Sequence, residues 1–362
     1  MHGVMPSGDA DHNRHRSSRL PLRLAEAALR PVTHETHETF FSQAQFIRAV
    51  AAASPSGGRV LKIPVPGCGP AREMYALEEV DHFGRRTISL GPFGLYASPG
   101  WDRELNPAVV KRIVARLTGI RTTRLVWTVR FDHRSLAEAL TSCGLKSRQH
   151  ATHVLPLGEP YDRIFSRFTA TIRNQIRRAK HDGVVVEEIN DESRLREYYA
   201  IYERLAQAQL RSWRYPFELF QQLLAIKNGV RILAAVHHGL MLGGGIFIRD
   251  GCSERYWHSA ADRGDRRLFP TCAILDRAIR DACANNATFF GFGGSIGKPS
   301  LEQFKTFWGA QREQYWEFEW RSPLWTRLSA LKSRLRPSVT RSLSDTSGVV
   351  TENMSMSRSN AQ

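Results

Sequence analysis

The order of helices and strands expected for residues 184–321 is the feature of this sequence that most restricts its fold. A strand is followed by two helices, then by three strands joined by tight turns, and finally by a helix, a strand, a short helix and a last strand. Apolar and β-branched runs identify the strands, and apolar residues three or four positions apart identify the helices. This order predicts an α/β (α+β layered) unit whose mixed, mostly antiparallel sheet is flanked by helices.

The first half of the chain carries a weaker copy of this pattern. Its short strands alternate with amphipathic helices, one of which begins with Pro107 in its first turn and another of which ends at Gly144. Apolar residues spaced four apart then predict one long basic helix over 161–182, which Gly183 ends. We therefore predict an internal duplication. The expected parts are a first lobe at 37–160, a connecting basic helix at 161–183 and a second lobe at 184–321.

The two ends of the chain have compositions that do not support a packed core. Residues 1–36 mix His, Arg, Ser and Pro without a helical or strand period, and the residues after 336 are rich in serine. Residues 324–336 place leucines on one side of a short basic helix, which suits either contact with a membrane surface or ordinary packing. We expect a disordered leader at 1–36 and a tail at 322–362 that contains this amphipathic helix.

Charge and cysteine content narrow the class of protein. The 51 Lys and Arg residues exceed the 35 Asp and Glu residues, and the net charge of +16 favours anionic partners such as nucleic acid, phosphorylated substrates or an anionic membrane. A solvated basic surface is the alternative. The five cysteines include no C-x-x-C pair and the histidines show no metal spacing, so we expect a cytoplasmic protein without a metal site. The sequence contains neither an apolar run long enough to span a bilayer nor a secretion signal.

The most specific local pattern is a glycine-rich turn between a strand and a helix. Gly293, Gly294 and Ser295 follow an apolar strand, and the next short helix carries Phe304 and Lys305. Glycines allow a ligand to approach the backbone closely, and a helix N-terminus carries a partial positive charge. The turn therefore predicts a ligand site, although a packing turn with a surface lysine fits the same residues.

This turn and a second segment at 171–189 carry a resemblance to known families. The strand, the turn, the Phe-Lys pair and the aromatic-glycine pair Trp308-Gly309 resemble the C-terminal strand–turn–helix of the Fem-type peptidyltransferases and of the BioF2-like acetyltransferase domain proteins. Residues 171–189 look like the basic helix and following strand of those families. The resemblance implies tandem lobes of the GCN5-related N-acetyltransferase fold, of which the second is catalytic.

The resemblance also implies roles for the residues of the turn and its helix. Phe304 and Lys305 match positions associated with the 3′ end of an aminoacyl-tRNA donor and with the reacting ester. Lys305 is then expected to bring positive charge to the oxyanion that develops during acyl transfer. Gly293, Gly294 and Ser295 are expected to bind substrate beside it.

Three further residues match positions that hold the phosphates of the acceptor in the Fem-type family. These are Arg211 and Tyr215, four positions apart, and Tyr256 in the three-strand meander. An arginine fork suits phosphate oxygens. A solvated helix end for the first two and a core-facing aromatic for the third are the alternatives.

The stretch before the helix near Pro270 departs from acetyl-CoA enzymes of this fold. Those enzymes bind pyrophosphate with an R-x-x-G-x-G/A loop, whereas here Gly264 is followed by Asp265 and the expected spacing is lost. This departure disfavours simple acetyl-CoA chemistry. We expect no required cofactor, and the acyl donor stays open between aminoacyl-tRNA and acyl-CoA.

Taken together, the residues and the resemblance predict an N-acyltransferase or aminoacyltransferase that acts on an amine of a cell-envelope precursor, either peptidoglycan-type or a surface glycan. The expected partners are a phosphorylated or lipid-linked precursor, tRNA and, peripherally, the anionic inner membrane. One alternative is an acyl-CoA-dependent N-acetyltransferase of exopolysaccharide biosynthesis. The other is a non-catalytic basic module that binds nucleic acid or membrane.

Overall fold

The computed structural model describes residues 40–327 with short gaps, all within one compact unit of the chain that spans 36–362. The gaps are residues 56, 66–72, 98–105, 131–132, 212–213, 263, 265 and 296–297. The expected leader at 1–36 lies outside the described residues. The amphipathic helix expected at 324–336 is described only at its start, where residues 323–327 are helical.

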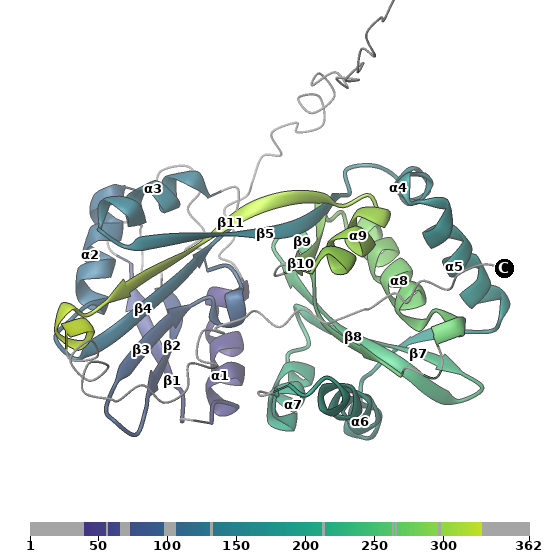
Figure 1. The fold of residues 1–362 in the computed structure, drawn as a ribbon, viewed down its shortest axis with the longest axis horizontal. Coiled ribbons are helices and arrows are strands. Elements are labelled where there is room, and N and C mark those ends of the chain that lie inside the picture. Colours follow the sequence, from purple (N-terminus) through teal and green to yellow (C-terminus); the bar gives the residue numbers. More distant parts are fainter. Residues whose placement is uncertain are drawn as a thin grey trace, which may run out of the picture. The chain divides into compact units, whose positions relative to one another are not determined.

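An eleven-stranded sheet runs through the described part of the chain (Figure 1). Its strand order is β1-β2-β3-β4-β11-β5-β10-β9-β8-β7-β6. In chain order the strands are β1 (Arg59–Pro64), β2 (Glu73–Val80), β3 (Arg86–Leu90), β4 (Thr122–Val129), β5 (Lys146–Pro156), β6 (Val185–Glu188), β7 (Val230–His237), β8 (Leu240–Asp250), β9 (Ser253–Ala261), β10 (Phe289–Gly294) and β11 (Gln311–Arg321).

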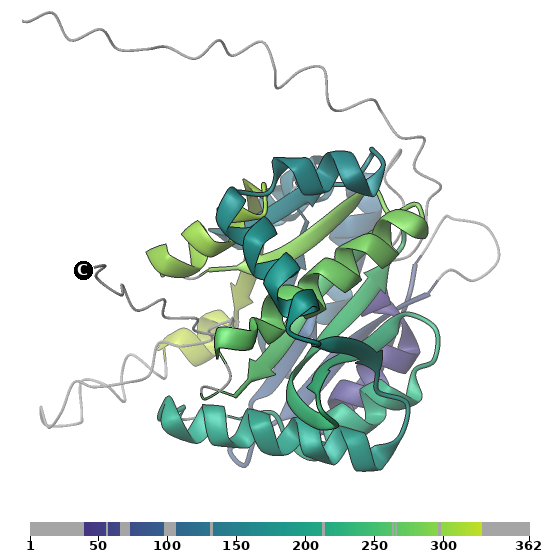
Figure 2. The same cartoon turned by 90° about the vertical axis from the view of Figure 1, so that its right-hand side faces the viewer.

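The helices pack on both faces of this sheet. They are α1 (Ala44–Ala52), α2 (Pro107–Leu117), α3 (Arg134–Ser142), α4 (Tyr161–Arg167), α5 (Ala170–His181), α6 (Glu192–Ala208), α7 (Phe217–Ala225), α8 (Pro270–Ala284) and α9 (Pro299–Phe307), with 3-10 turns at Phe40–Ser42, Pro92–Gly94 and Arg266–Leu268. Helices cover the sheet from both sides in Figure 2. Alternate residues of β7 agree with this layering, because Ile232 and Ala234 lie in the core with α6 and α7, whereas Leu233 and Ala235 lie in the core with α8.

The two halves of the sheet repeat one arrangement, which confirms the predicted fold class of tandem lobes with mostly antiparallel strands. In the first half the antiparallel strands β1 to β3 are followed by β4, which is parallel to β3. In the second half the antiparallel strands β6 to β9 are followed by β10, which is parallel to β9. Each parallel strand follows a helix, as a crossover connection requires.

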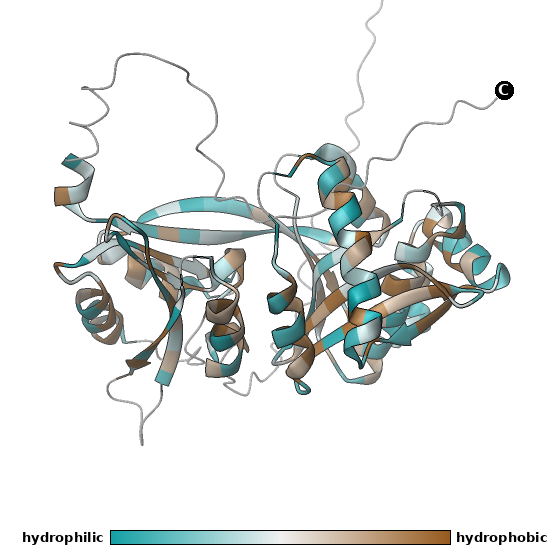
Figure 3. Ribbon diagram, turned by 90° about the horizontal axis from the view of Figure 1, so that it is seen from below, coloured by the Kyte–Doolittle hydropathy of each residue, from teal (hydrophilic) through white to brown (hydrophobic). Residues whose placement is uncertain are grey.

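The last strand of each half pairs within the sheet of the other half. Strand β5 pairs with β10, with Leu155 opposite Phe290, and β11 pairs with β4, with Phe318 opposite Trp127. The two exchanged strands also pair with each other, and both cross between the halves in Figure 1. Figure 3 shows that they are mostly hydrophilic where they cross, unlike β7 and β8. The lobe boundaries expected from the sequence stay a prediction, because this pairing joins both halves into one sheet.

The prediction of one long helix over 161–182 was wrong, because these residues form two helices, α4 and α5. Phe168 adopts an extended conformation at the break, with φ −62° and ψ 146°. The backbone N–H of Thr169 donates to the carbonyl of Phe307 at 2.9 Å, and Arg173 donates to the carbonyl of Ser166 at 3.0 Å. The apolar spacing continues across the break because Ile164, Phe168 and Ile172 all remain buried. None of the helices in the described residues is long and apolar enough to cross a membrane.

Candidate active site

Strands β9 and β10 run side by side and then separate, and the candidate site lies between them. They pair only as far as Arg255 and Gly291. Beyond this level each strand carries an extra residue relative to its other neighbour, Trp257 on β9 against β8 and Phe292 on β10 against β5. An extra residue bends a strand and disrupts the local ladder. The paired bulges therefore accompany the opening between the two strands.

A small, largely aromatic pocket occupies this opening. The side chains and backbone that line it belong to Phe93, Gly94, Leu95, Tyr96, Tyr215, Arg255, Tyr256, Trp257, Gly293, Gly294 and Tyr315. They come from a loop of the first half, from the two separated strands, from the segment before α7 and from β11. Both halves of the chain therefore build the pocket, although the sequence pattern assigned the site to the second lobe alone.

The structure brings together four of the residues singled out in the sequence. Tyr215, Tyr256, Gly293 and Gly294 all line the pocket. The ring of Tyr215 packs against Trp257 with centroids 5.1 Å apart, and its carbonyl accepts a hydrogen bond from Tyr199 at 2.9 Å. The pocket wall on this side is therefore fixed by both ring packing and backbone hydrogen bonds.

Lys305 reaches the glycine turn from α9 and is buried behind it. Its Nζ donates to the carbonyl oxygens of Gly293 at 2.8 Å and Gly294 at 2.7 Å, and only 2% of the residue is exposed. Burial lowers the pKa of Lys305 to about 7. In a planar trans peptide the N–H points opposite to the C=O. The N–H groups of Gly294 and Ser295 are therefore turned away from Nζ.

Ser295 and His153 complete a buried polar cluster beside Lys305. Ser295 is fully buried, and its Oγ lies 3.5 Å from Nδ1 of His153. Burial and the positive charge of Lys305 lower the pKa of His153 to about 4, so this imidazole is neutral at neutral pH. His153 could not be predicted as part of the site from the sequence, because it lies on the exchanged strand β5 and no local motif connects it to the turn.

Phe304 occupies the core rather than the pocket, which corrects its expected contact with a donor. It is 3% exposed, and its ring packs against Trp308 with centroids 6.2 Å apart. Leu301, Phe304 and Trp308 lie three and four positions apart and form the apolar face of α9 and its C-terminus. This helical spacing was the signal in the sequence that favoured a packing role.

Arg211 lies outside the pocket lining but beside another cation. Its Nε donates to Gln209 at 2.8 Å, whereas its buried Nη1 has no hydrogen-bond partner among the described residues. Burial and the charge of Arg211 both lower the pKa of Lys298, which precedes α9. The same charge adds to the effect of burial in lowering the pKa of His258 to about 3. Arg211 therefore adds positive charge to the N-terminus of α9, where Lys298 lies, and such an arrangement suits an anionic group.

A strained loop of the first half forms one wall of the pocket. Phe93 has φ 60°, a left-handed conformation that is rare for a bulky side chain, and its ring packs on Tyr215 at 5.2 Å. A Cβ on Gly91 would lie 1.7 Å from the carbonyl oxygen of Leu95, so the turn before Phe93 requires glycine. A strained conformation persists only where the surroundings hold it, and here the ring of Phe93 packs against Tyr215 and Trp257.

The corresponding place in the first half is filled. Strands β3 and β4 stay paired as far as Leu90 and Trp127. The fully buried indole of Trp127 donates to the carbonyl of Ala97 at 2.8 Å, and the N–H of Ala97 donates to Thr128 at 2.9 Å. In the first half, the returning loop thus fills the place beside β4 that corresponds to the opening between β9 and β10. The first half therefore contributes a wall instead of a second pocket.

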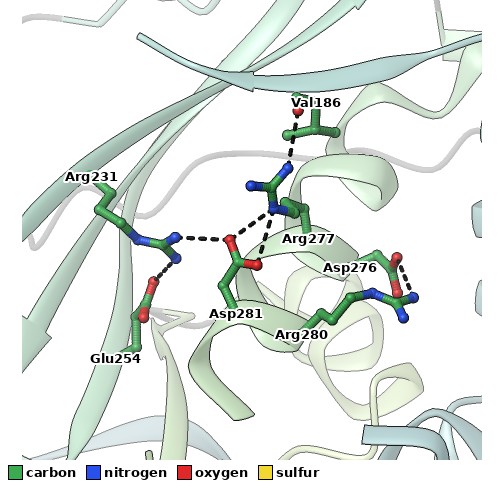
Figure 4. Close-up of polar contacts among 7 residues, drawn as sticks. All are labelled: Val186, Arg231, Glu254, Asp276, Arg277, Arg280 and Asp281. Atoms are coloured by element: carbon green, nitrogen blue, oxygen red, sulfur yellow. Dashed lines mark hydrogen bonds and ion pairs between the residues drawn. The ribbon is translucent and has the colours of Figure 1, made fainter. Parts of the chain in front are cut away.

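An ion-pair network anchors β9 just before it separates from β10 (Figure 4). Arg231 on β7 bridges Glu254 at 2.6 Å and Asp281 on α8 at 2.8 Å. Arg277 joins the network through Asp281 at 2.8 Å and also donates to the carbonyl of Val186. Burial raises the pKa of Glu254 despite the opposing charge of Arg231. Glu254 directly precedes Arg255, the last residue of β9 that pairs with β10. The network therefore anchors β9 next to the residue at which the pocket begins.

The central part of the chain matches a known family. Residues 166–306 match the family model described as Acetyltransferase (GNAT) domain. This segment is a GNAT domain. No curated protein is significantly similar to the chain in sequence.

Solved structures share a fold with this chain that extends over both of its halves. The structure of FemX has a TM-score of 0.66 at 14% identity and covers 83% of this chain and 95% of its own. A conserved protein of unknown function from Bacteroides thetaiotaomicron VPI-5482 has a TM-score of 0.51 at 9% identity, covering 76% and 90%. The C-terminal domain (DUF2156) of a putative lysylphosphatidylglycerol synthetase from Agrobacterium fabrum has a TM-score of 0.50 at 11% identity, covering 80% and 94%. With its GNAT domain, the chain is an acyltransferase.

The first turn of α8 in the GNAT domain consists of buried residues. Pro270, Thr271 and Cys272 form its first turn and are all buried. The Sγ of Cys272 donates to Gln175 on α5 at 3.2 Å, and Phe269 before the helix has φ 51°. A pyrophosphate needs exposed N–H groups at such a helix start. The burial therefore agrees with the loss of the acetyl-CoA loop motif from the sequence.

Proposed function

We propose that the protein transfers an acyl or aminoacyl group to an amine of a cell-envelope precursor, either peptidoglycan-type or a surface glycan. The observation that carries this proposal is the contact of Lys305 Nζ with the carbonyls of Gly293 and Gly294 at the edge of the aromatic pocket. The fold shared with FemX and with a putative lysylphosphatidylglycerol synthetase supports envelope precursors as acceptors.

In the proposed reaction, the nitrogen of the acceptor attacks the carbonyl carbon of the donor within the pocket. The carbonyl oxygen becomes an oxyanion, and the N–H groups of Gly294 and Ser295 stabilise it. The nitrogen then loses a proton, the bond to the leaving oxygen or sulfur of the donor breaks, and that atom takes up a proton. Lys305 acts as a positioning residue, because its ammonium group holds the two carbonyls of the turn and so orients their peptide planes.

The anionic parts of the substrates are assigned to two basic regions. Arg211 and Lys298 are proposed to bind the phosphates of the acceptor, since the buried Nη1 of Arg211 has no partner among the described residues. The exposed basic residues of α4 and α5 are proposed to attract an aminoacyl-tRNA donor. They are Arg163, Arg167, Arg177, Arg178 and Lys180. Arg173 is excluded from this group, because it caps backbone carbonyls at the break between the helices.

The donor is proposed to be aminoacyl-tRNA rather than acyl-CoA, because the described residues of the first turn of α8 are buried, whereas a pyrophosphate needs exposed N–H groups there. Peripheral contact with the inner membrane through residues 324–336 stays a prediction, since most of that segment lies outside the described residues.

The proposal is tested by incubating the full chain with charged tRNA or acyl-CoA and with lipid-linked amine acceptors, and by measuring products by mass spectrometry. We expect an aminoacyl mass to be added to an acceptor with charged tRNA, and the Lys305→Met variant to lose this product. Product formed only with acyl-CoA would contradict the assigned donor. Absence of product with every donor would contradict the proposed transfer.

A further inference from the structure

Arg255 carries a charge that no described residue neutralises. It lies at the last paired position of β9 and lines the aromatic pocket. Its guanidinium carbon lies 3.8 Å from the centroid of the Tyr96 ring and 5.6 Å from that of Phe41. Across the described ranges, the guanidinium makes no hydrogen bond or ion pair. The distances therefore place this half-buried guanidinium over two aromatic rings, and these cation–π contacts are its polar interactions within the described residues.

This environment prepares Arg255 for an anionic ligand. A guanidinium has five N–H donors in a rigid fork, and stacking on a ring fixes its plane while leaving its edge available. A partly buried cation without a hydrogen-bond partner has lost hydration that an anion can replace. The described residues that line the pocket include no carboxylate. The described lining therefore offers a ligand one positive charge that no carboxylate of the lining offsets.

We propose that Arg255 binds a carboxylate of the acceptor, on the same small unit as the amine that reacts. The inference rests on the proposed function, because Arg255 and the glycine turn of Gly293 and Gly294 line one small pocket. Arg255 is the one arginine or lysine in its described lining, so the charges balance with a monoanion better than with a phosphate dianion. A carboxylate can also accept two parallel hydrogen bonds from the edge of one guanidinium. The acceptor unit is therefore of the amino-acid type.

Binding of small probes to the full chain tests the site without requiring turnover. Ligand-observed NMR titrations compare alanine, which has an amine and a carboxylate, with ethylamine and with inorganic phosphate. We expect alanine to bind in preference to the other two. Arg255→Gln should weaken alanine binding by about tenfold or more, and Arg255→Lys by less, because lysine keeps the charge without the fork.

Arg196→Gln is the matched control for these measurements. Arg196 also stacks on a ring, that of Phe217 at 4.4 Å, but Glu192 already pairs with its guanidinium. Alanine binding should be unchanged in this variant, and thermal melting checks that every variant is folded. Equal alanine binding by Arg255→Gln and the wild type would overturn the inference. So would a preference for phosphate that depends on Arg255.

Kinetics separates failure of this site from failure of the proposed reaction. With an acceptor that carries a carboxylate, Arg255→Gln should raise KM about tenfold or more, and replacing the carboxylate by a carboxamide should remove this difference. Transfer with an unchanged KM in Arg255→Gln would overturn the site and leave the reaction standing. Arg255-dependent alanine binding without any transfer would contradict the reaction and leave the carboxylate site standing.

Discussion

The ammonium nitrogen of Lys305 lies 2.7 Å from the carbonyl oxygen of Gly294, on the buried side of the turn whose backbone lines the pocket. The lysine therefore contacts the wall of the site from behind. A residue in this position controls the direction of two peptide planes, and its loss changes the site without removing a direct substrate contact.

Replacing Lys305 by Met keeps much of the side-chain volume and removes both hydrogen bonds to the turn. We expect the rate of transfer to fall about 100-fold, the typical effect of disturbing an oxyanion-binding group. Steady-state kinetics measures the effect. Thr306→Ala on the exposed side of the same helix is the control, because its hydroxyl bonds only to the carbonyl of Glu302 within α9. Equal losses in both variants would contradict the positioning role.

The buried lysine also predicts a pH dependence of stability. Burial lowers the pKa of Lys305 from 10.5 to about 7, so between these values the unfolded chain binds more protons at this residue than the folded protein does. The free energy of unfolding should therefore rise with pH across this interval, by a few kcal/mol in total. Urea unfolding of the wild type and of Lys305→Met at several pH values measures the difference, and parallel curves would exclude the shift.

Two glycines with similar positive φ angles allow the effect of backbone strain to be separated from the effect on function. Gly293 has φ 71° and Gly239, in the hairpin between β7 and β8, has φ 79°. An alanine at either position should lower the free energy of unfolding by about 1 kcal/mol, because a left-handed conformation is unfavourable for a residue with a Cβ. Only Gly293→Ala should also reduce transfer, since Gly293 lines the pocket and accepts from Lys305. Chemical unfolding and kinetics on both variants provide the comparison.

Arg231 is expected to be among the most important charges for stability. Arg231→Met would leave Glu254, whose side chain is 5% exposed, without its partner at 2.6 Å. An uncompensated buried charge costs about 3 kcal/mol or more, whereas an exposed pair contributes about 1 kcal/mol at most. Arg196→Met, which removes an exposed pair with Glu192, is therefore the control. Similar unfolding free energies for the two variants would contradict this assignment.

Local patterns predicted the elements of this fold well, and failed where a contact over a long sequence distance decided the outcome. The order of strands and helices in both halves and the turn at Gly293 followed from periodicity and turn residues. The prediction of a continuous helix over 161–182 was wrong. The helix is interrupted where Thr169 donates to the carbonyl of Phe307, and apolar spacing does not reveal such a long-range contact. Phe304 was placed in the site, although its helical spacing from Leu301 also fitted the core position that it occupies.

The sequence by itself determined which segments form strands and helices, and that a lysine-bearing helix follows a glycine turn. Tertiary structure decided that β5 and β11 exchange partners, which brings His153 beside Ser295 and places Tyr315 in the pocket. It also decided that Arg255 meets Tyr96 and no acidic side chain within the described ranges. The physical reason is that periodicity reports only which face of an element is buried. The pairing between distant strands sets which charged and aromatic groups meet on that face.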